Sequence, residues 1–270
     1  MKNYLLLLLL AFFTFQCTPD TKEDENFTEE DTGEFVSEEN SNKLSDLEEK
    51  MEELEAGKAS TNSIKEVVKQ KAEGAKSVQV DINIATCKLK LSGGSKQLFT
   101  GGFAYSQADW KPETSYKLEG KKGFLEIKQP DTKDININDD DEYVWNLKFG
   151  EKTPLNINLE FGAGVSEIQL GGLPIKNFNM LMGVGKTTLD LRGEWKQNTE
   201  IHLDGGIGLL QVYLPESIGV QIKTIKGLGS IEVLNMIKKD KNTYVNKQFN
   251  KSKININIFL KTGIGKIEIE

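Results

Sequence analysis

Histidine and cysteine are scarce in this chain of 270 residues, which has one histidine, His202, and two cysteines, Cys17 and Cys87. A single histidine argues against zinc sites and against nucleophilic catalysis that uses a histidine base. His202 falls in an alternating apolar pattern, which predicts a solvent-facing strand residue. The longest apolar run, residues 5–15, is shorter than the roughly 20 residues that a membrane-spanning helix needs.

Residues 1–17 resemble a bacterial lipoprotein signal, with Lys2, the apolar run and then Cys17. The resemblance implies export, acylation of Cys17 and attachment to a membrane, which we expect to be the outer membrane. Phe15 and Gln16 depart from the small residue usual before the cysteine, which leaves open secretion through another cleavage. With Cys17 acylated, Cys87 has no disulfide partner, and we expect it to be a small buried residue.

The next segment, residues 18–59, is strongly acidic, with sixteen carboxylates and four lysines in a chain of net charge −7. High charge with few apolar residues predicts a disordered acidic tether over residues 18–41. Lys22 and the three acidic residues after it resemble an export signal for surface display of lipoproteins. A plain tether on the periplasmic side remains the alternative. The acidic total argues against nucleic acid as a partner.

Residues 42–73 predict a short helical stalk. Leu44, Leu47, Met51 and Leu54 follow helical spacing, and a second helix is expected to begin at Ser63. The pattern is too short for a sustained coiled coil, so self-association through the stalk is left open.

Residues 151–270 consist of a repeated unit in which a strand, a Gly-x-Gly corner and a second strand follow one another. The strands alternate apolar and polar residues, which indicates one buried and one solvated face. Five such units can bury together what one unit cannot, so we expect an all-β, solenoid-like stack. We assign a polar insert at about residues 238–252 to a loop that lengthens the last interval. The corner glycines are Gly162, Gly164, Gly183, Gly185, Gly206, Gly208, Gly227, Gly229, Gly263 and Gly265.

Residues 75–150 add a divergent first unit with its corner at 85–87, followed by several antiparallel strands. The chain resembles the bacterial toast-rack proteins in four features taken together. These are the stretch from Leu98 to Tyr105, the sequence Trp110-Lys-Pro, the sequence Trp145-Asn-Leu and the serial Gly-x-Gly units. The resemblance implies an N-terminal toast-rack domain at 75–150 and a LiaF-like repeat domain at 151–270. It also implies an envelope protein without catalysis, connected with adhesion or envelope stress.

No catalytic residue, metal site or cofactor site is expected from the sequence. Lys186 and Thr187 after a glycine corner resemble a phosphate-binding loop, but a strand follows where a helix is required. The acidic residues 139–142 predict a charged turn rather than a calcium loop. Exposed aromatic residues, in particular Trp110, Trp195 and Tyr213, are candidates for stacking on sugars, although large aromatics in β domains are more often core.

The leading interpretation is a non-enzymatic envelope lipoprotein that binds a protein or a glycan on a broad sheet surface. One alternative is a carbohydrate-active enzyme, or a glycan-binding protein, on a β-solenoid. Paired carboxylates on strands keep the enzyme open, although none stands out by its surroundings. A purely structural spacer is the other alternative.

Overall fold

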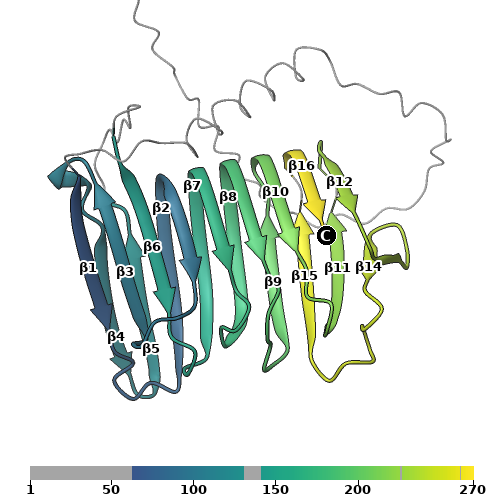
Figure 1. Ribbon diagram of the computed structural model, residues 1–270, viewed down its shortest axis with the longest axis horizontal. Helices are drawn as coiled ribbons and strands as arrows, with labels where there is room; N and C mark the ends of the chain where they lie inside the picture. The colour runs from purple at the N-terminus through teal and green to yellow at the C-terminus, as the bar shows by residue number, and fades with distance from the viewer. Residues whose placement is uncertain (1–62, 131–140, 226, 262) are drawn as a thin grey trace, which may run out of the picture. The chain divides into compact units, whose positions relative to one another are not determined.

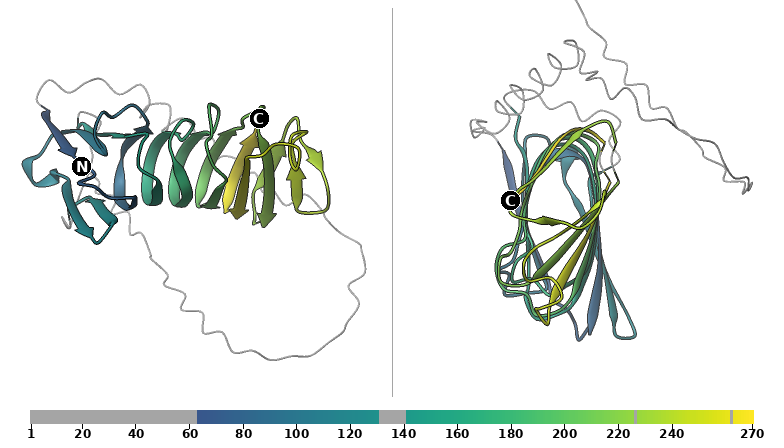
Figure 2. Two further views of the ribbon diagram at one scale, coloured as in Figure 1. Left: turned by 90° about the horizontal axis from the view of Figure 1, so that it is seen from below. Right: turned by 90° about the vertical axis from the view of Figure 1, so that its right-hand side faces the viewer.

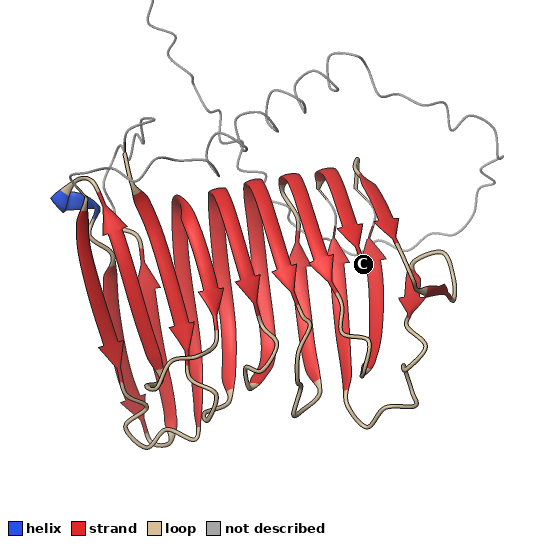
Figure 3. Ribbon diagram, in the orientation of Figure 1, coloured by secondary structure: helices blue, strands red, loops and turns tan. Residues whose placement is uncertain are grey.

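The computed structural model describes residues 63–130, 141–225, 227–261 and 263–270, all within the unit Ser37–Glu270. These residues form sixteen β-strands and one short 3-10 helix, η1 (Ala108–Trp110), which confirms the all-β expectation (Figure 3). The strands are β1 (Ile64–Gln70), β2 (Ser77–Ser92), β3 (Phe99–Tyr105), β4 (Glu113–Glu119), β5 (Lys122–Lys128), β6 (Tyr143–Phe149), β7 (Leu155–Gln169), β8 (Ile175–Asp190), β9 (Thr199–Asp204), β10 (Ile207–Tyr213), β11 (Gly219–Ile225), β12 (Ser230–Val233), β13 (Ile237–Lys238), β14 (Thr243–Val245), β15 (Asn255–Lys261) and β16 (Ile264–Ile269).

The long strands β2, β7 and β8 build the repeat. Each runs through a corner and pairs in parallel with the next along most of its length, as Figure 1 shows. The corners stay in register, so that Cys87 lies beside Gly164 and Gly164 beside Gly185. In the later units the corner separates two strands, β9 from β10 and β15 from β16.

Two faces result, because every unit contributes one strand segment before its corner and one after it. The first face contains β4, β5, the first halves of β2, β7 and β8, then β9, β15, β11, β14 and β13. The second face contains β1, β3, β6, the second halves of the long strands, then β10, β16 and β12. Viewed from the end, the two faces lie on opposite sides of a shared interior (Figure 2). The inward residues of both faces form one apolar core, as the alternation predicted.

Close approach of successive units explains why both corner positions are glycine. A Cβ on Gly183 would lie 1.9 Å from the carbonyl oxygen of Gly162, and a Cβ on Gly185 would lie 1.9 Å from that of Gly164. Gly185 also has φ +143°, a conformation that residues with a side chain rarely adopt. The corner therefore excludes side chains by contact and, at its second glycine, by backbone conformation as well.

The order of the stack differs from the order of the chain. β15 and β16, the last strands in sequence, lie between the β9–β10 unit and the β11–β12 unit. The last two units of the chain are therefore exchanged in the stack. Ile256, Ile258 and Leu260 of β15 are fully buried, as an inner strand requires, whereas β12 has four residues and half-buried inward side chains, which suits an edge.

The insert before β15 is also more ordered than a loop. It carries β13 and β14, and β14 pairs antiparallel with β11 and so closes the first face at this end. The expectation of a simple bulging loop is corrected, because β11 would otherwise present an unpaired backbone edge.

The predicted helical stalk is not found in residues 63–73. Ile64–Gln70 forms strand β1, which pairs antiparallel with β3 from Ile64 opposite Tyr105 to Gln70 opposite Phe99. The β-branched side chains of Ile64, Val67 and Val68 favour an extended backbone, and β3 satisfies its hydrogen bonds. The rest of the proposed stalk, residues 42–62, lies outside the described residues, as do the tether and Cys17.

The first unit has no glycine corner and uses a side chain instead. The amides of Ala85 and Thr86 donate hydrogen bonds of 2.7 and 3.0 Å to the Gln129 side-chain oxygen. Cys87 beside them is buried, as expected. The hydrogen-bonded sheet continues from β2 into β7, across the boundary expected at residues 150 and 151.

Candidate functional site

Outward side chains on the first face line up in rows, because the parallel strands are in register. We call one of these the central row. It crosses β5, β2, β7, β8, β9, β15 and β11 in that order. The central row consists of Glu126, Asp81, Asn158, Asn179, His202, Phe259 and Lys223.

Hydrogen bonds fix one half of the central row. The amide of Asn179 donates to the side-chain oxygen of Asn158 at 2.8 Å, and the amide of Asn158 donates to Asp81 at 2.7 Å. In the neighbouring row Asn177 donates to Asn156 at 2.8 Å. These ladders orient several amide and carboxylate groups along the face, so that they need little reorganisation to meet a ligand.

Rings form the other half of the row. The ring of His202 stacks on Phe259, with centroids 4.7 Å apart and an interplanar angle of 13°. The Lys223 ammonium lies 5.8 Å from the Phe259 centroid. The His202 Nε2 is 2.5 Å from a carboxylate oxygen of Glu200. His202 is therefore exposed on its strand, as predicted, and its ring lies face to face with that of Phe259. We call this stacked pair the platform.

A hollow of about 580 Å³ lies beside this platform on the first face. It extends over five strands, and its polar lining comes from the central row and the row next to it. The polar residues are Asp81, Asn83, Glu126, Asn158, Glu160, Asn179, His202 and Asp204. Leu181 adds an exposed apolar side chain. Carboxylates and amides beside flat rings are the groups that bind a sugar, through its hydroxyls and its apolar ring face.

Metal binding finds no support in this face. Across residues 63–130 and 141–270, apart from 226 and 262, no three histidine, cysteine, aspartate or glutamate side chains gather as metal ligands would. Asp141 and Glu142 are the described part of the acidic turn, and residues 139–140 lie outside it.

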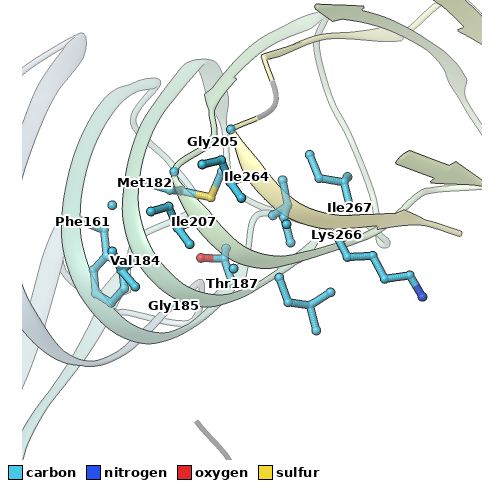
Figure 4. Close-up of a pocket in the computed structure, with 17 residues that line it drawn as sticks. Phe161, Met182, Val184, Gly185, Thr187, Gly205, Ile207, Ile264, Lys266 and Ile267 are labelled. Atoms are coloured by element: carbon cyan, nitrogen blue, oxygen red, sulfur yellow. The ribbon is translucent and has the colours of Figure 1, made fainter. Parts of the chain in front are cut away.

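A second, apolar hollow follows the glycine corners (Figure 4). Met182, Val184, Ile207 and Ile264 line it together with the corner backbones. Its volume of about 30 Å³ has room for little more than one water molecule, so it is no ligand site. Thr187 points into the core and shares a 2.8 Å hydrogen bond with Ser166, and a strand follows it, which agrees with the rejection of a phosphate loop.

Two of the aromatic candidates belong to the core. Trp110 and Trp195 are buried, and Tyr213 is half-buried with the Arg192 guanidinium 4.7 Å from its ring centroid. Sequence reasoning missed Phe259 as a platform residue. Its outward position in the alternation of β15 was visible, but its neighbour His202 was not, because β9 and β15 are distant in the chain.

Among the described residues, the structure contains no helix with the length and apolar character to cross a membrane. Two family models match the sequence. The N-terminal domain of toast_rack, DUF2154, matches residues 55–213, and the C-terminal domain of LiaF, cell wall-active antibiotics response, matches residues 172–269. A comparison with curated proteins finds no match.

Solved structures provide a further comparison. A crystal structure described as a putative cell adhesion protein from Clostridium sporogenes is 38% identical, with a TM-score of 0.73, over 77% of this chain and 98% of that one. One described as a putative adhesin from Bacteroides fragilis is 11% identical, with a TM-score of 0.34, over 78% and 98% of the chains, which is too low for a functional argument. Because the toast_rack model spans more than half of the sequence and the Clostridium relative is 38% identical, this chain belongs to the toast-rack family.

Proposed function

We propose that this protein is a non-enzymatic, envelope-associated binding module that holds a glycan on its first face. The observation that carries the proposal is the His202 ring, stacked on Phe259, in the lining of a 580 Å³ hollow with carboxylates and amides around it. Stacking on a ring and hydrogen bonding to hydroxyls act together only where both lie on one surface, as they do here.

Family membership supports the cellular setting. One matching model is named for a response to cell wall-active antibiotics, and the Clostridium relative is described as a putative cell adhesion protein. A role in adhesion or in the envelope stress response agrees with both. Acylation of Cys17 would hold the module at the membrane and remains our proposal, together with the location on the outer membrane.

The arrangement favours binding over catalysis. Glu126 and Glu160 are exposed on an open face, and no apolar wall surrounds the carboxylates of the hollow. A glycosidase needs one carboxyl group whose surroundings keep it protonated, and such surroundings are apolar and enclosed. A protein partner would find few apolar anchors here, since Leu181 is the one large exposed aliphatic residue in the lining of the hollow.

The test compares two phenylalanines on the same face. Phe259→Ala removes the ring on which His202, a lining residue of the hollow, is stacked. Phe124→Ala instead removes a ring on β5 that has the Lys122 ammonium 4.9 Å from its centroid. The full chain and both variants are applied to an array of bacterial and host polysaccharides, and a bound glycan is then titrated by calorimetry. We expect Phe259→Ala to weaken binding by about tenfold or more, since stacking on one aromatic ring contributes roughly 1–3 kcal/mol in nucleic-acid recognition.

Phe124→Ala should leave the affinity unchanged. Equal losses in both variants would contradict a site at the platform. Turnover of a polysaccharide by the purified chain would overturn the non-enzymatic assignment, and binding of a protein but no glycan would assign the face to a protein partner.

A further inference from the structure

The insert that closes the first face carries a concentration of positive charge. Residues 238–253, which we call the basic cap, contain six lysines and one aspartate. All six lysine side chains are exposed, and none has a carboxylate in ion-pair distance among the described residues. The cap lysines are Lys238, Lys239, Lys241, Lys247, Lys251 and Lys253.

The rest of the folded region does not share this excess. Without the cap, residues 60–270 contain twenty-three lysines and arginines and twenty-four carboxylates. The cap therefore holds the whole positive excess of this region, on one end of the stack (Figure 1). Two exposed apolar side chains, Leu234 and Ile237, come just before Lys238 in the chain and are 43% and 46% exposed.

The same chain contains a sequence of opposite character. Residues 37–59 have eight carboxylates and three lysines, and four apolar residues, Leu44, Leu47, Met51 and Leu54, lie among them. We propose that this acidic segment binds the basic cap of its own chain, with carboxylates on the cap lysines and leucines against Leu234 and Ile237. The proposal is independent of the glycan site.

The number of residues between the acidic segment and β1 determines which carboxylates can reach the basic cap. From β1, where the described chain begins, to β12 there are eight strand spacings, about 38 Å at roughly 4.8 Å each. An extended chain spans this with about twelve residues at ~3.3 Å per residue. Residues up to about 51 can therefore reach the end of the stack that carries the cap, whereas Glu52, Glu53 and Glu55 lie too close to β1 in sequence to do so.

Covalent connection favours the contact within one chain. A short covalent connection gives the segment an effective concentration in the millimolar range near the cap, far above that of a second copy in dilute solution. The attraction acts between solvent-exposed charges, so salt weakens it, since the Debye length falls to about 3 Å at 1 M ionic strength.

A carbodiimide experiment tests the proposal, because this reagent joins a carboxylate to a lysine only where the two touch. The full chain is treated at low salt, and the joined peptides are identified by mass spectrometry. We expect products between residues 38–49 and the cap lysines, at about tenfold higher yield than with other exposed lysines, equivalent to 1.4 kcal/mol. Addition of high salt should remove the difference.

Two charge-matched variants provide the controls. The cap variant Lys238→Glu, Lys239→Glu, Lys241→Glu should lose the products. The control variant Lys121→Glu, Lys152→Glu, Lys176→Glu changes the same charge at exposed lysines elsewhere and should keep them. Thermal unfolding of each variant checks that it is folded.

Exchange of the charges between segment and cap then distinguishes a loss of binding from a loss of the groups that react with the carbodiimide. Glu38→Lys, Glu39→Lys and Glu48→Lys alone should abolish products at the cap, and combination with the cap variant should restore them with the roles of the two groups reversed. A mixture of ¹⁵N-labelled and unlabelled chains distinguishes the source. Products joining labelled to unlabelled peptides would assign the cap to a second copy and overturn the proposal, as would products spread evenly over all lysines.

Discussion

The rings of His202 and Phe259 stack 4.7 Å apart, although 57 residues separate them in the chain. The contact exists because β15 returns from the C-terminus and inserts between β9 and β11. The final strands are therefore internal to the sheet, and the platform on the first face depends on them.

Removal of the C-terminal strands should abolish folding. A chain ending before Asn255 lacks β15 and β16, which leaves β12 unpaired and removes one of the two partners of each of β9, β10 and β11. We expect no cooperative thermal unfolding of this chain by circular dichroism. A serial stack would tolerate loss of its last unit, so a stable truncated protein would contradict the observed strand order.

Gly185→Ala should be severely destabilising. Its φ of +143° lies in a region used almost only by glycine, which costs another residue roughly 1–3 kcal/mol, and its Cβ would lie 1.9 Å from the Gly164 oxygen. Gly172→Ala is the matched control, with φ +85° and nothing within 4 Å of the new Cβ. Denaturant unfolding should show a much larger loss at Gly185, and equal losses would mean that steric contact at the corner is unimportant.

Leu189→Ala tests the packing of the core. Leu189 is 0% exposed, so the free energy of unfolding should fall by roughly 2–5 kcal/mol. Val184→Ala provides the comparison, because Val184 is 40% exposed at a corner, and it should change stability by less than about 0.5 kcal/mol. A near-neutral result at Leu189 would mean that the inward face of β8 is assigned wrongly.

The Ser166–Thr187 pair should show strong coupling. Each hydroxyl is buried, and the two are 2.8 Å apart. Ser166→Ala or Thr187→Val alone leaves one buried hydroxyl unsatisfied, at a cost of about 1–3 kcal/mol, whereas the double variant removes both groups. Chemical unfolding of all four proteins measures the coupling, and strictly additive losses would contradict the shared hydrogen bond.

Alkaline pH should destabilise the protein through Tyr143. Burial, and to a smaller extent the neighbouring Cys87, raises the pKa of this phenol, which donates a 2.8 Å hydrogen bond to the carbonyl of Trp110. A raised folded-state pKa stabilises below the unfolded value of about 10 and loses that contribution as the pH rises above it. Tyr143→Phe should therefore be less stable at neutral pH but flatter in unfolding free energy above pH ~10. Parallel curves for the two proteins would contradict this role.

The alternation of apolar and polar residues made most of the fold predictable from the sequence. Strict alternation placed Leu155, Ile157 and Leu159 inside, and the structure confirms them as buried. The positions of the glycine corners were equally predictable, because the close contact between neighbouring backbones leaves no room for a side chain. The order of the units was not readable, since β11 and β15 have the same alternating pattern and pair through backbone groups that every residue possesses.

The error at the stalk has a different cause. Ile64, Val67 and Val68 fit helical spacing by chance, and their β-branched side chains were the better signal. At the candidate site, the alternation of β7 and β8 is enough to place Asn158 and Asn179 on the outward face, but the contact of Phe259 with His202 depends on the insertion of β15 beside β9.

The inserted position of β15 sets a limit on the order of events during synthesis. A ribosome releases β9 and β11 well before β15, yet each of them acquires its parallel partner on one side only when Asn255–Lys261 emerges. The nascent chain must hold β11 apart from β9, although their patterns would allow them to pair directly. The sheet is therefore complete only after β15 and β16 have left the ribosome, and a direct β9–β11 pairing is the alternative that this topology has to avoid.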